Sequence, residues 1–175
     1  ESGVLIKGGE ALQRTGDVTA VVFDKTGTLT VGKPTVSAVI GLAPGLTADL
    51  VVRAAAAVGA QSEHPLAAAI VSEAARRGLT LARPTAFTST PGLGAAGTVE
   101  GVEVRMGREA FVGGDSGKRS PGAAAPDDTE VHVALDGRHA GVIQLHDPLR
   151  ADAAAAVARV AALGLTPILL TGDRQ

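Results

Sequence analysis

The 175-residue chain contains no cysteine, no tryptophan and no tyrosine. Without cysteine, both disulfide bonds and thiolate metal sites are excluded, and a reducing cytoplasm is permitted. The only aromatic side chains besides histidine are Phe23, Phe87 and Phe111. Hydrophobic residues still make up 45% of the chain, and many of them are alanine. We therefore expect a core of small aliphatic side chains that depends on close backbone packing.

A basic surface and a long apolar run are also missing. Lysine and arginine number 16 against 18 acidic residues, and the two signs are interspersed, so we expect no nucleic-acid partner. Apolar runs such as Ile168–Leu170 are far shorter than the roughly 20 residues that a membrane-spanning helix needs. The chain begins at Glu1 without methionine and stops at Gln175 directly after a polar motif, which indicates a segment of a longer protein.

The two ends of the chain predict a parallel α/β sheet. Thr19–Phe23 reads as a buried strand that leads into Asp24–Thr28, and Pro167–Leu170 reads as a second strand that leads into Thr171–Asp173. An alanine-rich helix over Arg150–Leu163 precedes the second strand. Ligands of such sheets bind at the carboxyl ends of the strands. Both polar segments are therefore expected at one edge of the sheet.

The middle of the chain predicts an inserted α+β domain with an antiparallel sheet. Its strongest signal is a hairpin turn at Asp136–Gly137, because Asp-Gly suits a two-residue β-turn. A loop at Gly113–Asp128, rich in glycine, serine and proline, is predicted to be disordered. We expect one domain from residues 1–33 and 145–175, and the inserted domain from residues 34–144. The remaining predicted elements are strands at Thr35–Ile40, Gly97–Val99, Val102–Met106, Glu130–Leu135 and Arg138–Leu145, and helices at Thr47–Val58 and Pro65–Arg77.

Asp24 is the candidate nucleophile. A carboxylate at a strand end can attack a phosphoryl group and form an aspartyl phosphate. Because two anions must meet, a magnesium ion and nearby donors have to neutralise charge. The alternative is that Asp24 caps a turn and that the following Thr-Gly-Thr is ordinary loop sequence. The suitable donors are Lys25, the hydroxyls of Thr26 and Thr28, the N–H groups around Gly27, and Thr171 and Gly172 on the neighbouring strand.

The seven-residue string DKTGTLT, from Asp24 to Thr30, resembles the phosphorylation signature of P-type ATPases. Thr171–Asp173 (TGD) resembles the second signature of that family, and His146–Arg150 (HDPLR) resembles its hinge segment. The resemblance implies a truncated haloacid-dehalogenase-like parallel sheet as the phosphorylation domain, with a nucleotide-binding domain inserted. It also implies that ATP phosphorylates Asp24 and that Mg²⁺ binds at Asp24 and Thr26. The implied catalytic set is Asp24, Lys25, Thr26, Thr28, Thr171, Gly172 and Asp173.

Thr26 bears on whether the phosphoenzyme is hydrolysed at once, as in a phosphatase, or persists, as in a pump. Haloacid-dehalogenase-like phosphatases place a second aspartate two positions after the nucleophile, where it acts as general acid and base. This chain has Thr26 there. Without that base the phosphoenzyme is not hydrolysed at once and persists long enough to drive a conformational change. The substitution favours a pump over a phosphatase.

Ser62–Leu66 (SEHPL) resembles a motif of heavy-metal-transporting P-type ATPases in which the histidine positions ATP. Taken alone, Ser-Glu-His-Pro is more often a helix cap. Gly92–Gly97 resembles the family's GxGxxG loop, in which missing Cβ atoms allow close backbone approach to the nucleotide. That pattern alone is weak evidence, and a dinucleotide-binding interpretation fails because no such fold accompanies it. The implied nucleotide-binding residues are Glu63, His64, Pro65, Gly92, Gly94, Ala95, Gly97, Gly107 and Arg108.

Three departures from the family pattern bear on activity. Gly59 stands where many members have glutamate, and Arg108 stands where they have asparagine, so we expect weaker discrimination for adenine. Arg108 could instead reach a phosphate or stack on the base. The third signature, GDGxNDxPAL, is absent from the chain. We therefore expect nucleotide binding but little turnover by this chain alone, and an incomplete sheet that is poorly ordered or covers its edge with another copy.

The resemblance implies partners that lie outside this chain. They are ATP, a transmembrane domain and an actuator domain of the same pump, and a transported heavy-metal ion, with Cu(I) as the first candidate and zinc or cadmium also allowed. The location implied is the cytoplasmic face of a membrane. Two other functions stay open: a nucleotide-binding regulatory module that is never phosphorylated, and a haloacid-dehalogenase-like phosphatase with a large cap. His132, His139 and His146 recur every seven residues; a metal site is one interpretation, and surface or turn histidines are the favoured one.

Overall fold

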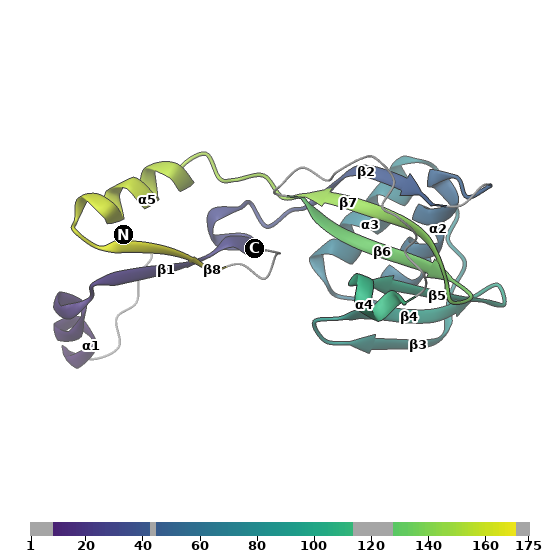
Figure 1. Ribbon diagram of the computed structural model, residues 1–175, viewed down its shortest axis with the longest axis horizontal. Helices are drawn as coiled ribbons and strands as arrows, with labels where there is room; N and C mark the ends of the chain where they lie inside the picture. Colours follow the sequence, from purple (N-terminus) through teal and green to yellow (C-terminus); the bar gives the residue numbers. More distant parts are fainter. Residues whose placement is uncertain (1–8, 43–44, 114–127, 171–175) are drawn as a thin grey trace. The chain divides into compact units, whose positions relative to one another are not determined.

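The computed structural model describes residues 9–42, 45–113 and 128–170. The chain divides into two compact units, one built from residues up to Val31 and from Leu149 onward, the other from Gly32–Pro148. Figure 1 shows the helices and strands of each unit. Among the described residues, no helix is both long and apolar enough to cross a bilayer.

The Gly32–Pro148 unit contains a six-stranded antiparallel sheet with the strand order β2-β7-β6-β5-β4-β3 (Figure 1). The predicted hairpin is confirmed: Asp136 and Gly137 have φ of 46° and 73°, the left-handed conformation that a type I′ turn needs at both positions. Sequence analysis missed β3 and placed the start of β4 three residues late. The strands are β2 (Thr35–Gly41), β3 (Thr85–Thr90), β4 (Gly94–Val99), β5 (Val102–Gly107), β6 (Thr129–Leu135) and β7 (Arg138–His146).

Two helices pack on one face of this sheet: α2 (Ala48–Gly59) and α3 (Pro65–Arg76). The side chain of Thr47 caps α2 by accepting the Leu50 N–H at 3.3 Å, and Pro65 occupies the first turn of α3, where a missing N–H costs no hydrogen bond. Small residues let the helices approach closely. A Cβ placed on Gly59 would lie 3.4 Å from the Cβ of Ala67.

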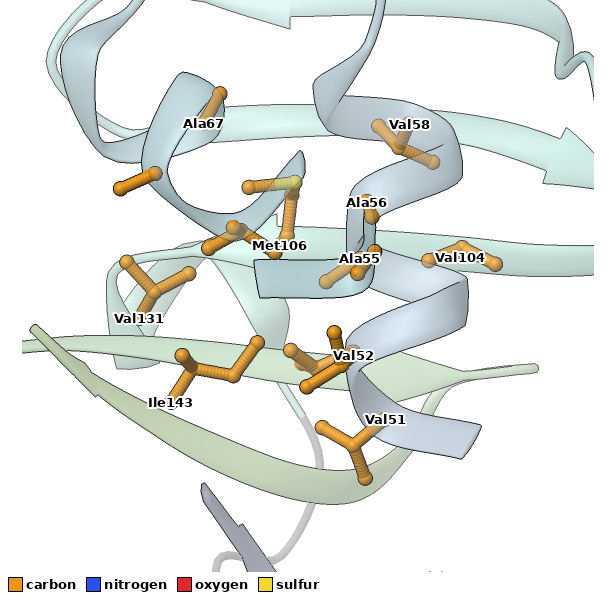
Figure 2. Close-up of a cluster of buried hydrophobic side chains, with 14 of the residues drawn as sticks. Val51, Val52, Ala55, Ala56, Val58, Ala67, Val104, Met106, Val131 and Ile143 are labelled. Carbon is orange, nitrogen blue, oxygen red and sulfur yellow. The ribbon is translucent and has the colours of Figure 1, made fainter. Parts of the chain in front are cut away.

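The core of this unit lies between the two helices and the sheet. Figure 2 shows Val52 and Ala55 of α2 among Val104, Met106 and Ile143 from the strands. No phenylalanine is among the buried residues of the described chain, and Phe87 packs against the cluster only partly buried. The expectation of a small-aliphatic core is confirmed.

The other unit holds a two-stranded parallel sheet of β1 (Ala20–Asp24) and β8 (Thr166–Leu170), with α5 (Ala153–Ala162) packed on β8. The predicted parallel pairing is confirmed, but the prediction that both strands are buried is wrong. Val22, Ile168 and Leu170 are 58%, 46% and 62% exposed. These three side chains lie on one face of the sheet, Leu169, 54% exposed, lies on the other, and the described residues supply little cover for either. The unit also contains α1 (Gly9–Arg14), a short helix η1 (Thr15–Asp17) and an irregular turn η2 (Lys25–Leu29).

Two predictions fall largely outside the described residues. The expected disordered loop lies outside them except at its ends, Gly113 and Asp128. Thr171, Gly172 and Asp173 lie outside them entirely. The short helices α1, η1 and α4 (Glu109–Val112) were not predicted, and α4 packs against β5 and β6.

Candidate active site

Asp24 is the last residue of β1, and it pairs in register with Leu170, the last residue of β8. Because the strands are parallel, both carboxyl ends lie at one edge of the sheet, as expected. The Asp24 side chain is exposed there. The position of Thr171 and Gly172 beside it stays a prediction, since those residues lie outside the described part of the chain.

The turn after Asp24 is closed by Thr30, a residue that sequence analysis did not single out. The Thr30 hydroxyl accepts the Gly27 N–H at 3.0 Å and donates to the Lys25 carbonyl at 3.2 Å, while the Thr30 N–H donates to the same carbonyl at 3.1 Å. Gly27 has φ of 76°, a conformation that favours glycine, and Thr30 is 1% exposed. The sequence feature that could have predicted this closure is a threonine three residues after a turn glycine.

The exposed side chains of this turn form a set of hard oxygen donors. Thr26 and Thr28 are exposed, as is Asp24, and Lys25 is half-buried. A carboxylate and hydroxyl oxygens are the ligand type that Mg²⁺ prefers, so these residues fit a magnesium ion. The turn thus offers an accessible carboxylate with donors and metal-binding oxygens around it.

The HDPLR segment is tied to the residues that follow DKTGTLT within each unit. In the Gly32–Pro148 unit, Asp147 Oδ1 accepts the N–H groups of Gly32 and Lys33 at 3.0 and 3.2 Å. In the other unit, the Arg150 N–H donates to the Leu29 carbonyl at 2.8 Å. In each unit, hydrogen bonds therefore hold together the two chain segments that lead to the other unit.

His64 caps α3. Its ring Nδ1 accepts the Leu66 N–H at 3.2 Å, and the backbone N–H of His64 donates to Ser62 Oγ at 3.3 Å. The helix-cap interpretation of Ser-Glu-His-Pro is confirmed. Because Nδ1 must keep its lone pair to serve as the cap, the ring proton sits on Nε2. The exposed imidazole therefore presents an N–H donor to solvent, with Glu63 and Pro65 also exposed beside it.

The predicted glycine loop is a turn followed by a strand. Gly92, with φ of 73°, sits in the turn, and β4 begins at Gly94, directly opposite Gly107 of β5. A Cβ on Gly107 would collide with the Leu93 carbonyl oxygen and lie 2.6 Å from the Gly94 Cα. The Arg108 N–H also donates to the Leu93 carbonyl at 2.8 Å. Two glycine segments that lie far apart in the sequence are thus in direct contact.

Not every residue of the predicted nucleotide set faces the same way. Ala95 is 6% exposed and belongs to the core, and a Cβ on Gly97 would lie 3.6 Å from Val58 on α2. Their side-chain positions therefore point toward the helices, whereas a Cβ on Gly94 would point at Phe111 on α4. Only backbone atoms of Ala95 and Gly97 are available to a ligand on the α4 face.

The two substituted positions, Gly59 and Arg108, have different surroundings. Gly59 is buried at the end of α2 against Ala67. Arg108 is exposed at the start of α4, and within the described residues its guanidinium makes no ion pair. Only Arg108 is therefore available to contact a ligand through its side chain.

The three regularly spaced histidines separate into two environments. His132 and His139 stack, with His132 Nδ1 3.1 Å from His139 Nε2, whereas His146 Nδ1 lies 2.9 Å from Asp128. The favoured prediction of surface or turn histidines is wrong for His132, which is 8% exposed. Across residues 9–42, 45–113 and 128–170, no group of three or more metal-ligating side chains is found.

Residues 18–175 match the haloacid dehalogenase-like hydrolase family. The chain belongs to that family. This membership agrees with an aspartate at the carboxyl end of a parallel strand, and it confirms the expected haloacid-dehalogenase-like sheet.

The curated relatives of this haloacid dehalogenase-like chain are metal-transporting P-type ATPases. It is 39% identical over its whole length to a silver exporting P-type ATPase of Salmonella typhimurium, and 43% identical over 98% of its length to a copper-exporting P-type ATPase of Mycobacterium tuberculosis. A zinc/cadmium/lead-transporting P-type ATPase of Shigella sonnei is 42% identical over 98% of the chain. The chain spans 22% of each of the first two relatives and 23% of the third.

Solved structures that resemble this chain also come from ATPases. The catalytic CPx-ATPase domain CopB-B superposes with a TM-score of 0.72 at 25% identity, covering 98% of this chain and 59% of that one. The N-domain of HMA6, a copper-transporting P-type ATPase, gives a TM-score of 0.56 at 30% identity, covering 65% of this chain and 99% of that one. The haloacid dehalogenase-like chain therefore resembles the catalytic domain of heavy-metal P-type ATPases, which confirms the resemblance stated from its motifs.

Proposed function

We propose that this chain is the ATP-binding and phosphoryl-accepting part of a P-type ATPase that exports heavy-metal ions from the cytoplasmic face of a membrane. The observation that carries the proposal is Asp24, exposed at the end of β1 and followed by a turn that Thr30 closes. The transmembrane and actuator domains would belong to the same pump. We assign residues 1–33 and 145–175 to the phosphorylation domain and 34–144 to the nucleotide-binding domain.

The proposed reaction is transfer of the γ-phosphoryl group of ATP to Asp24. A carboxylate oxygen of Asp24 bonds to the γ-phosphorus, and the bond to the bridging oxygen breaks, so that ADP leaves with the electron pair. Lys25 and the hydroxyls of Thr26 and Thr28 would stabilise charge on the phosphoryl oxygens. Thr171, Gly172 and Asp173 would complete this set. A bound Mg²⁺, held by Asp24 and Thr26, would supply further charge compensation.

The proposed nucleotide site combines a cap and a turn. The Nε2–H of His64 supplies a donor, and the Gly92–Gly94 turn together with Gly107 supplies backbone close to the ligand. Within the described residues no hydrogen bond or ion pair joins His64 to that turn, so the nucleotide would span them. Arg108 would contact a phosphate or stack on the base. Glu63, Pro65, Ala95 and Gly97 would line the site, the last two through their backbone.

Thr26 supports a pump rather than a phosphatase. A hydrolytic member of this family needs a general base close to the nucleophile, and Thr26 offers a hydroxyl in that position. The aspartyl phosphate would therefore last until another domain of the pump supplies the base. The transported ion would be chosen in the membrane part, and we test Cu(I) first, with zinc, cadmium and silver as the other members of the same class.

The proposal is tested on the intact parent transporter with radiolabelled ATP. We expect acid-stable, hydroxylamine-labile phosphate on the unmodified protein and none on Asp24→Asn. Asp17→Asn is the matched control, since Asp17 lies before β1 and is exposed, and it should label normally. Label or metal transport that persists in Asp24→Asn would overturn the assignment. Rapid hydrolysis of a simple phosphomonoester would instead support the alternative that the protein is a phosphatase.

Nucleotide binding is tested on the 175-residue chain itself. During titration with ATP, the amide signals of His64, Gly92 and Gly94 should shift together in NMR spectra. A titration that moves only signals of the β1–β8 unit would contradict the proposed nucleotide site, while leaving the role of Asp24 to the labelling experiment.

A further inference from the structure

Two imidazole rings meet on the face of the six-stranded sheet that lies away from α2 and α3. The neighbours of His132 on β6, Val131 and Val133, point into the core, so His132 points to the opposite face. His139 comes from β7, and its Nε2 lies 3.1 Å from His132 Nδ1, a hydrogen bond between the two rings whose proton a bound metal ion would displace. We infer that His132 and His139 form a bidentate site for a divalent transition-metal ion such as Zn²⁺, Ni²⁺ or Cu²⁺.

The separation of the two nitrogens fits two bonds to one ion. Metal–nitrogen bonds of about 2.0–2.1 Å that meet at about 90–109° place the nitrogens about 2.8–3.4 Å apart. The observed 3.1 Å falls within that range. A linear complex, the arrangement that Cu(I) can adopt with two ligands, needs about 4 Å with similar bond lengths. The pair therefore suits divalent ions with adjacent binding positions and does not suit a linear Cu(I) complex.

The surroundings prepare the His132 ring for this role. Glu130 Oε2 lies 3.8 Å from His132 Nε2, so the carboxylate favours the proton on that nitrogen and leaves the lone pair of Nδ1 turned toward His139. Burial lowers the pKa of His139 against the raising effects of the Glu109 charge and of a hydrogen bond with the Gly141 backbone. A neutral imidazole is the form that binds metal.

The coordination sphere would be completed by water. The described residues offer no third ligand side chain in the cluster, since no group of three is found among them. His139 is half-buried rather than buried, which gives an ion access to the pair. His132 lies directly opposite Gly107 of β5, so the pair borders the proposed nucleotide site, but its two ligands are not residues of that site.

The test uses the 175-residue chain after removal of any affinity tag. Zn²⁺ binding is measured by calorimetry, and Ni²⁺ serves as a paramagnetic probe that broadens amide signals close to the bound ion. We expect one Zn²⁺ per chain and broadening centred on His132 and His139. His139→Ala should weaken binding by at least about tenfold, because one of two linked ligands is lost. Glu130→Gln should weaken it by about tenfold through loss of the orienting carboxylate.

Two further variants keep the result interpretable. His146→Ala removes an imidazole from the same hairpin strand outside the pair and should bind like the unmodified chain. His139→Gln replaces the ring with a polar side chain in case His139→Ala does not fold, which dispersed amide signals would check. Acidification from pH 7.5 to pH 5 should abolish binding, since protons compete at His132 and His139 while Glu130 and Glu109 are the carboxylates near them. Unchanged binding in both His139 variants, or broadening centred on His146 or His64, would overturn the inference.

Discussion

Gly94 on β4 lies directly opposite Gly107 on β5, and neither position has room for a side chain. A Cβ on Gly94 would lie 2.7 Å from the Phe111 ring and 2.9 Å from the Gly107 Cα. Strands β4 and β5 can therefore pair at this point only with glycine at both positions. The backbone surface that we propose for close approach to a nucleotide is therefore one that the sheet itself requires.

Gly107→Ala should destabilise the Gly32–Pro148 unit. The φ of 148° and the collision with Leu93 add backbone strain to overpacking, for a total of about 2–4 kcal/mol. Gly92→Ala is the control, because its φ of 73° carries strain but nothing lies within 4 Å of an added Cβ; about 1 kcal/mol is expected. Urea unfolding followed by circular dichroism measures both. Equal midpoints for the two variants would contradict the packing argument.

Local chemistry explains which elements the sequence predicted well. The Asp136–Gly137 turn, the Thr47 cap and Pro65 each act within a few residues, so the β6–β7 hairpin and the helices α2 and α3 were found within a few residues of their ends. The strand before Asp24 followed from a short β-branched run. The position of Asp24 at a strand end needed no tertiary information.

The predictions that failed concern features that depend on contacts between distant segments of the chain. Strand β3 has mostly polar residues, and its pairing with β4 cannot be seen from its own composition. The exposure of Ile168 depends on what covers the sheet, not on the apolar run itself. Pairing of His132 with His139 requires the bulge-containing register of the β6–β7 hairpin. Thr30 was missed because a motif resemblance directs attention to the reactive residues rather than to the one that closes their turn.

Thr30→Val should open the turn that carries Asp24 while keeping side-chain volume. The change removes the acceptor of the Gly27 N–H and one donor to the Lys25 carbonyl, and an unpaired buried group costs about 1–3 kcal/mol. The Gly27 amide should lose protection in hydrogen exchange, and phosphorylation of the parent transporter should slow. Thr30→Ser restores the hydroxyl and should recover most of the protection. A protected Gly27 amide in Thr30→Val would show that the turn closes by other means.

His64 is predicted to combine a structural and a ligand-binding role, and two substitutions separate them. Asparagine is a good helix cap, so His64→Asn should keep α3 stable while losing the Nε2–H donor. His64→Ala should lose the cap as well, at a cost of about 1 kcal/mol. Calorimetric titration with ATP should show weaker binding in both variants, whereas urea unfolding should distinguish them. Full ATP affinity in His64→Asn would remove His64 from the nucleotide site.

Glu73 links α2 and α3 through arginine. Its carboxylate accepts hydrogen bonds from Arg76 and from Arg77 at 2.7 Å, and Arg77 also contacts Asp49 at 2.8 Å. The side chain of Glu73 is only 10% exposed. The hydrogen bond from Arg76, with a further one from Arg77, outweighs burial and lowers the pKa of Glu73 from 4.5 to about 2. The unfolded chain therefore binds this proton more readily than the folded one.

The pH dependence of stability follows from that difference. The stabilisation by Glu73 is complete above the unfolded pKa of 4.5 and is lost as the pH falls toward the folded pKa of about 2. Glu73→Gln should cost about 1.5–3 kcal/mol at pH 7, typical of hydrogen bonds to a charged group, and should flatten the acid side of the stability profile. Glu100→Gln, at an exposed ion pair with Arg53, is the charge-matched control and should keep the original slope. Urea unfolding between pH 7 and pH 3 measures all three proteins. An acid slope in Glu73→Gln as steep as in the unmodified chain would place the acid sensitivity in other carboxylates.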